Sequence, residues 1–167
     1  MLSATCHCGA VVLEVASKPR KLTQCNCSIC RRYGVLWAYY SRKTARVVSG
    51  QRSLSVYRFR NGGIEFNHCK VCGVVTHYEW ARKTPDSKFV VNARNLDPDV
   101  VASTRIKMLD GAATWKVLEE YVQPDIFRSP AKPPPPPARG AVRARRRDVR
   151  RRRVASGRHE TRAGRNG

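Results

Sequence analysis

The chain has 167 residues and a formal net charge of +21, from 33 Lys and Arg against 12 Asp and Glu. The length allows one domain with some additional chain. No apolar stretch approaches the roughly 18 residues that a membrane-spanning helix needs. The first residues lack the basic and apolar regions of an export signal, so we expect a soluble, cytoplasmic protein without a membrane partner.

Taken in chain order, the first 128 residues predict a mainly β domain. Short runs rich in β-branched and aromatic residues, bounded by Gly, Pro, Asn and Asp, are typical of strands. Residues 61–63 mark a turn between two such runs. The one helix that we expect is short and lies around residues 115–121. The expected strands cover residues 11–15, 35–40, 46–48, 54–59, 64–66, 74–80 and 88–91.

The remainder of the chain, residues 129–167, differs in composition. It holds 13 Lys and Arg against 2 Asp and Glu, a net +11, whereas residues 1–128 hold 20 against 10, a net +10. Five consecutive prolines at 133–137 can neither form a helix nor donate to a sheet. The arginine runs that follow contain no aromatic residue and no apolar periodicity. We therefore predict a folded domain over residues 1–128 and a disordered Pro/Arg-rich tail over residues 129–167.

Seven cysteines, all within the first 72 residues, indicate metal binding. An odd number leaves one thiol over in any disulfide scheme, and a reducing compartment favours metal sites over disulfides. Two tetrahedral sites need eight ligands, and seven thiolates do not suffice. One site therefore has only three thiolates or recruits a ligand of another kind. Three protein ligands and an open position are typical of catalytic zinc. The cysteines form three groups: Cys6 and Cys8; Cys25, Cys27 and Cys30; Cys69 and Cys72.

Spacing alone does not decide which group joins the zinc knuckle Cys69-Lys70-Val71-Cys72-Gly73. Three histidines, His7, His68 and His77, are candidates for an additional ligand. A histidine beside a knuckle is more often a hydrogen-bonding neighbour of the ligands, so we expect none of the three to bind metal directly.

The ordered motifs Cys6-His7-Cys8-Gly9-Ala10, Cys25-Asn26-Cys27-Ser28-Ile29-Cys30-Arg31 and Cys69-Lys70-Val71-Cys72-Gly73 closely resemble those of one family. This is the glutathione-dependent formaldehyde-activating enzyme family, which includes centromere protein V, and the resemblance covers residues 3–123. It implies a tent-like arrangement of antiparallel sheets pinned by a structural zinc. It also implies that Cys6, Cys8, Cys69 and Cys72 hold this zinc, and that Cys25, Cys27 and Cys30 hold a second, catalytic zinc.

The activity implied by the resemblance is that of a carbon–sulfur lyase acting on glutathione and formaldehyde. A thiol that enters the open position of a three-thiolate zinc is deprotonated there, which suits such a reaction. Arg31 and Arg32 follow the last ligand of the open site and are candidates to pair with the carboxylates of the thiol. For each of these two arginines, we slightly favour the interpretation that it lies in a solvent-exposed basic turn over a role in substrate binding. Tyr33 and Trp37 are more typical of a core than of a pocket.

The alternative function is a non-catalytic, zinc-stabilised module for protein interaction or nucleic-acid binding. An arginine-rich tail attracts phosphate backbones in a weak, salt-sensitive way. The tail carries no aromatic residues on which bases stack, so we favour a dispensable extension over a nucleic-acid arm.

Overall fold

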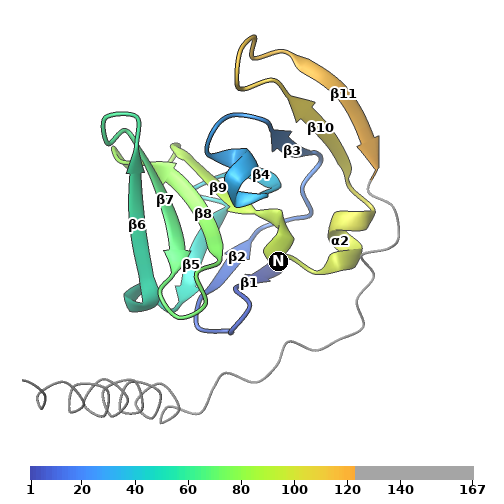
Figure 1. The fold of residues 1–167 in the computed structure, drawn as a ribbon. Coiled ribbons are helices and arrows are strands. Elements are labelled where there is room, and N and C mark those ends of the chain that lie inside the picture. The colour runs from blue at the N-terminus through green and yellow to red at the C-terminus, as the bar shows by residue number, and fades with distance from the viewer. Residues whose placement is uncertain (123–167) are drawn as a thin grey trace, which may run out of the picture. The chain divides into compact units, whose positions relative to one another are not determined.

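The computed structural model describes residues 1–122, which form two β-sheets (Figure 1). The predicted tail, and the predicted domain end at residue 128, lie outside the described residues. No helix among residues 1–122 is long and apolar enough to cross a membrane. The elements are β1 (Leu2–Thr5), β2 (Val12–Val15), β3 (Leu22–Cys25), α1 (Cys30–Tyr33), β4 (Trp37–Ser41), β5 (Ala45–Ser49), η1 (Gln51–Ser53), β6 (Leu54–Phe59), β7 (Ile64–Cys69), β8 (Val75–Trp80), β9 (Lys88–Asn92), η2 (Ala93–Asn95), α2 (Pro98–Ala102), β10 (Arg105–Leu109) and β11 (Val117–Val122).

A three-stranded sheet, ordered β1-β2-β5, packs against an eight-stranded sheet, ordered β11-β10-β3-β4-β9-β8-β7-β6. All strand pairs are antiparallel except β10 with β3. Alternate side chains of the small sheet, such as Leu13 and Val15, share one apolar core with Ala38 and Val91 of the large sheet. Each fully buried Leu or Val of this kind stabilises the fold by about 1.5–3 kcal/mol. The expected mainly β class is confirmed.

The opposite face of the large sheet carries an aromatic cluster. Trp37 lies within 5.9 Å of Phe66 and 4.8 Å of Tyr78, measured between ring centroids, and Tyr33 lies 5.7 Å from Phe66. Such tilted and edge-to-face contacts add to the free energy gained from burying the rings. Cys25 and Cys30 belong to the same cluster, so this face supports one of the cysteine groups.

Each expected strand overlaps an observed one, and residues 60–63 form the expected turn. Strands β1, β3 and β10 were not predicted, because each is short and mixes polar with apolar residues.

The helix expected around residues 115–121 is wrong: this segment contains β11, which pairs antiparallel with β10. The intervening loop is closed by hydrogen bonds from Trp115 N to Asp110 O (2.7 Å) and from Asp110 N to Lys116 O (2.9 Å). These bonds direct the chain back along β10. Leu118 is exposed and only Tyr121 packs on the core, so pairing with β10 holds this segment more than burial of an apolar face does.

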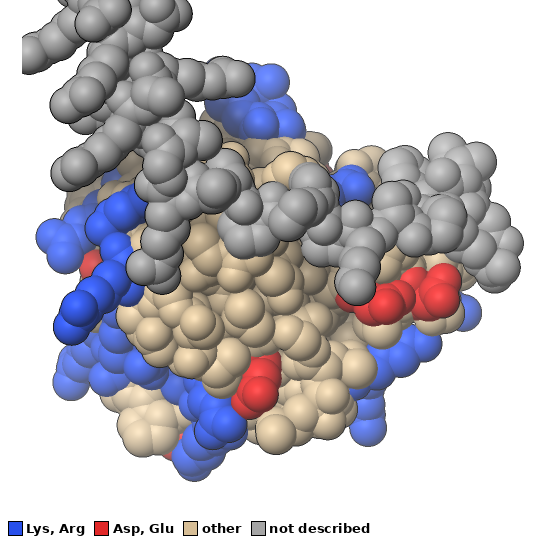
Figure 2. All heavy atoms as spheres, turned by 90° about the horizontal axis from the view of Figure 1, so that it is seen from below, with Lys and Arg blue, Asp and Glu red and all other residues tan. Residues whose placement is uncertain are grey.

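Basic residues outnumber acidic ones over the described part of the chain. Residues 1–122 hold 19 Lys and Arg against 9 Asp and Glu, a net +10. In Figure 2 the Lys and Arg side chains surround an uncharged area, and acidic side chains are few on that face. A surface of this kind raises the local concentration of anionic ligands.

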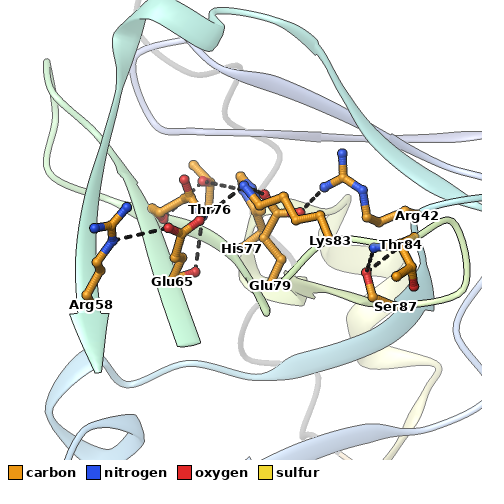
Figure 3. A network of polar contacts seen from close by, with 10 residues as sticks. Arg42, Arg58, Glu65, Thr76, His77, Glu79, Lys83, Thr84 and Ser87 are labelled. Carbon is orange, nitrogen blue, oxygen red and sulfur yellow. Dashed lines mark hydrogen bonds and ion pairs between the residues drawn. The ribbon is translucent and has the colours of Figure 1, made fainter. Parts of the chain in front are cut away.

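Two buried carboxylates, Glu65 and Glu79, are neutralised by three cations (Figure 3). Lys83 Nζ bridges them at 3.1 Å and 2.8 Å, Arg58 donates to Glu65, and Arg42 donates to Glu79. Burial by itself would raise the pKa of Glu65. The interactions with Lys83 and Arg58 outweigh this effect, so the net pKa of Glu65 lies below its ordinary value. Removing one partner would leave a buried charge uncompensated, which is costly.

His77 lies beside this network and is buried. Its ring stacks on Phe89 with 4.5 Å between centroids, and its Nδ1 lies 3.0 Å from Thr76 Oγ1. Burial, and then the charges of Lys83 and Arg42, lower its pKa to about 3. The folded chain therefore keeps His77 neutral at a pH where the unfolded chain protonates it.

We expect the free energy of unfolding to fall as the pH drops below about 6.5, the pKa of an unperturbed histidine, and to go on falling toward pH 3. At about pH 5.5 the loss due to His77 alone is about 1 kcal/mol relative to about pH 7.5. Urea titrations of the wild type and His77→Gln at both pH values measure it. The variant loses less stability between the two pH values than the wild type; equal losses would contradict the assignment.

Candidate metal centres and active site

Four cysteines from two distant turns meet at one point. Cys6 and Cys8 lie between β1 and β2, Cys69 ends β7, and Cys72 follows in the turn to β8. Their Sγ atoms all lie within 4.8 Å of one another, with 3.6 Å between Cys6 and Cys8 and 3.7 Å between Cys8 and Cys69. A tetrahedral zinc with Zn–S bonds of about 2.3 Å separates its sulfurs by about 3.8 Å. The donor set therefore fits zinc.

The two turns are built alike. Gly9 N donates to Cys6 O (2.9 Å) and Gly73 N to Cys69 O (2.8 Å), and both glycines have positive φ, 76° and 75°. Backbone N–H groups also donate to sulfur, from Val11 to Cys6 Sγ (3.3 Å) and from Val71 to Cys69 Sγ. Left-handed backbone at a residue after the knuckle favours glycine, which accounts for this residue in both motifs.

The electrostatics of this closed group also favour a bound cation. Burial raises the pKa of Cys8 to about 12. Burial opposes ionisation of Cys72 too, but the backbone N–H of Val74 and neighbouring groups lower its pKa to about 7. Four clustered thiolates, three of them buried, would be costly without a counter-charge, and a divalent ion removes that cost.

The second group consists of Cys25, Cys27 and Cys30, whose Sγ atoms also lie within 4.8 Å of one another. Cys25 ends β3 and Cys30 begins α1, a four-residue helix closed by Gly34 in the left-handed conformation. Trp37 Nε1 donates to Cys30 Sγ (3.2 Å), and Cys27 N lies 3.5 Å from Cys25 Sγ. Among residues 1–122, no fourth Cys, His, Asp or Glu joins this group, so its donor set leaves one position open.

Burial raises the pKa of Cys30, whereas backbone and side-chain hydrogen bonds outweigh burial at Cys27 and lower its pKa. This group therefore ionises first at Cys27. In the part of the chain that the structure describes, neither cysteine group includes His7, His68 or His77.

A hairpin loop that sequence reasoning missed lies against the open group. Asn26 Nδ2 donates to Asp110 Oδ1 (2.9 Å), and the backbone N–H of Ala112 donates to Asn26 Oδ1 (2.9 Å). A Cβ added to Gly111 would lie 2.3 Å from Cys25 Sγ. No local motif signals this contact, because it joins residues 84 and more positions apart.

The turn between β6 and β7 reaches the same hairpin. The guanidinium of Arg60 lies over the ring of Trp115, 5.5 Å from its centroid, and both residues have positive φ. Trp115 is 57% exposed. Figure 1 shows both loops at the same end of the large sheet, with α1 between them. The open group therefore lies between two loops that contact each other through Arg60 and Trp115.

The remaining candidates differ in their environments. Arg31 and Arg32 are exposed, and Arg32 Nη1 donates to Ser28 O at 2.6 Å, so this arginine braces its own turn. Trp37 is 1% exposed and belongs to the aromatic core, as expected, and Tyr33 is partly buried against it.

Comparison with known proteins agrees with this geometry. The family model described as "Glutathione-dependent formaldehyde-activating enzyme" matches residues 1–108. A crystal structure of a Rhodobacter sphaeroides protein, a structural genomics target, is similar with a TM-score of 0.51 and 34% sequence identity. The match covers 57% of this chain and 88% of that one. The residues matched by the family model include all seven cysteines and end before the 110–116 loop.

Substituting Gly111→Ala places a methyl group where Cys25 Sγ now lies. We expect the zinc content, measured by elemental analysis of the purified full chain, to fall from two ions per chain toward one. Gly63→Ala is the matched control, because its added Cβ approaches only Arg60 O, at 3.4 Å. Two ions retained by Gly111→Ala would contradict this packing of the hairpin on Cys25.

Proposed function

The chain belongs to the glutathione-dependent formaldehyde-activating enzyme family, and we propose that it is a zinc-dependent carbon–sulfur lyase that forms or cleaves S-(hydroxymethyl)glutathione. The observation that carries this proposal is the contrast between the two cysteine groups. Four sulfurs close one donor set and three leave the other open. On this proposal Cys6, Cys8, Cys69 and Cys72 hold a structural zinc, and Cys25, Cys27 and Cys30 hold a catalytic one.

A zinc held by Cys25, Cys27 and Cys30 would supply an open position and would lower the pKa of a thiol that enters it. The sulfur of glutathione then bonds to the carbonyl carbon of formaldehyde. The electron pair of the C=O double bond moves to oxygen, which takes up the proton to give the hydroxymethyl product. The reverse reaction breaks the same carbon–sulfur bond and releases the thiol and the aldehyde.

The chain's own residues fix the donor sulfurs and shape the entrance. The Trp37 N–H holds Cys30 Sγ in place from the core side. Asn26 joins the Cys25–Cys27 segment to the 110–116 hairpin, which restricts the directions from which a substrate approaches. Arg31 is exposed beside the site and is the better placed of the two arginines to meet a carboxylate, since Arg32 donates to Ser28 O.

The test is the rate of S-(hydroxymethyl)glutathione formation and cleavage, followed by NMR exchange spectroscopy with the zinc-loaded full chain. The addition proceeds without a catalyst, so the uncatalysed rate is measured in parallel. We expect acceleration that Cys27→Ser abolishes. Two zinc ions per chain with no acceleration, and no response of either ion to glutathione, would instead identify a non-catalytic zinc module.

The two sites are expected to respond differently to loss of one ligand. Cys69→Ser removes a ligand of the structural zinc, and the free energy of binding such a zinc contributes directly to the free energy of folding. Structural zinc binding is worth about 10 kcal/mol or more, which is comparable with the whole free energy of unfolding. We expect this variant to lose its cooperative thermal transition. Cys27→Ser keeps the transition within a few degrees and loses activity. Thermal melts followed by circular dichroism measure the transitions of both variants. Equal destabilisation by the two substitutions would show that the sites are not divided into a structural and a catalytic one.

A further inference from the structure

A cavity of about 430 Å³ is lined in part by β3, the strand that ends at Cys25, and it plays no part in the function proposed so far. The loop from β2 to β3 forms one wall and β4 another. The lining residues are Ser17, Lys18, Pro19, Arg20, Lys21, Thr23, Tyr39, Tyr40 and Lys107.

The cavity exists because β3 and β4 pair at a single position. Thr23 is opposite Trp37, and no further pair joins these strands. On one side of this pair, β3 continues to Cys25 and the open group. On the other side the strands separate, and the cavity lies between residues 17–23 and 39–40. The cavity and the open group are therefore neighbours on either side of the Thr23–Trp37 pair.

The lining is strongly cationic and includes no acidic side chain. Lys18 Nζ donates to Ser103 Oγ at 2.9 Å, a neutral partner that leaves its charge available. Lys21 is paired with Glu120 at 2.7 Å, whereas Lys18, Arg20 and Lys107 make no ion pair of 4 Å or less within residues 1–122. Lys107 is opposite Thr23 in the β3–β10 register, which brings its side chain to the same part of the sheet.

Two hydroxyl-bearing residues of the lining, Thr23 and Tyr39, lie next to each other. Thr23 is 1% exposed, whereas Tyr39 is 41% exposed and its hydroxyl lies close to that of Thr23. Tyr39 is therefore the one that a ligand in the cavity can reach, and its phenol O–H can donate to a ligand oxygen.

We propose that this cavity binds a carboxylate of the thiol substrate and thereby selects small acidic thiols. Arg20 and Lys107 pair with the carboxylate, and the hydroxyl of Tyr39 donates to it. The inference rests on the proposed function for the identity of the thiol, although the pocket itself is independent of catalysis. It places one of the two carboxylates of the thiol in a different part of the chain from Arg31, which remains available to the other.

The separation suits a ligand of tripeptide size. Thr23 and Cys25 are two residues apart on one strand, so their Cα atoms are about 6.6 Å apart. The thiol of glutathione is on its central residue, so a terminal carboxylate lies one to two residues of chain away, about 3.5–7 Å when extended. Its thiol can therefore reach the open group while a terminal carboxylate lies in the cavity.

The experiment measures binding rather than turnover, with S-methylglutathione as the probe. This molecule keeps both carboxylates and cannot present a free thiol to a metal. Isothermal titration calorimetry with the zinc-loaded full chain compares the wild type with Arg20→Gln/Lys107→Gln. We expect the double variant to raise Kd at least tenfold, because charge-assisted hydrogen bonds are lost. A Kd within twofold of wild type, or no binding by wild type, would overturn the proposal.

Lys43→Gln/Arg46→Gln is the matched control, since it removes the same charge from exposed residues that do not line this cavity. Its Kd should stay within twofold of wild type. An equal loss in this control would show that overall charge, not the cavity, attracts the ligand. Inorganic phosphate that displaces the probe with the same affinity would likewise overturn the assignment to an acidic thiol.

The two proposals fail separately. Binding of the probe that depends on Arg20 and Lys107, in a chain without lyase activity, would refute the function and support the pocket. Lyase activity whose KM for glutathione is unchanged in Arg20→Gln/Lys107→Gln would refute the pocket and support the function.

Discussion

The convergence of four sulfurs from two turns that are far apart in the sequence is the constraint on which the rest of the structure depends. Cys8 and Cys69 are 61 residues apart, yet their Sγ atoms are 3.7 Å apart. The first knuckle leads into the small sheet and the second joins β7 to β8 of the large sheet. A metal at this point therefore ties the two sheets together at the edge of the core that they share. With many strands of only four to six residues, such a tie replaces part of the stability that longer strands would provide.

The open group depends on the other face of the large sheet. Its sulfurs are held by a strand end, a one-turn helix and the indole of Trp37, which itself packs on Phe66 and Tyr78. The geometry of a three-sulfur set is easily lost, because each sulfur has alternative rotamers. Embedding Cys25 and Cys30 in an aromatic cluster restricts those rotamers before any ligand binds, which is the arrangement that a preorganised site requires.

Much of this could be predicted from local sequence. Alternation of residue types identified the longer strands, and cysteine spacing with flanking glycine identified both knuckles. The resemblance to a family then divided the cysteines in the way the fold brings them together. The segment predicted to be a helix is a strand. Trp115, Leu118 and Tyr121 have helical spacing, but pairing with β10 determines the conformation of this segment. Features made by distant residues were not predictable, among them the contact of Gly111 with Cys25 and the divergence of β3 from β4.

The hydrogen bond between Trp37 and Cys30 links the fluorescence of one tryptophan to the three-cysteine group. Trp37 is 1% exposed, whereas the two other tryptophans, Trp80 and Trp115, are 40% and 57% exposed. Emission from the buried indole is therefore blue-shifted relative to the other two and separable from them. Trp37 Nε1 lies 3.2 Å from Cys30 Sγ, close enough for the sulfur to quench the indole. We therefore expect the short-wavelength emission to change with occupancy of the three-cysteine group, without a dye or a label.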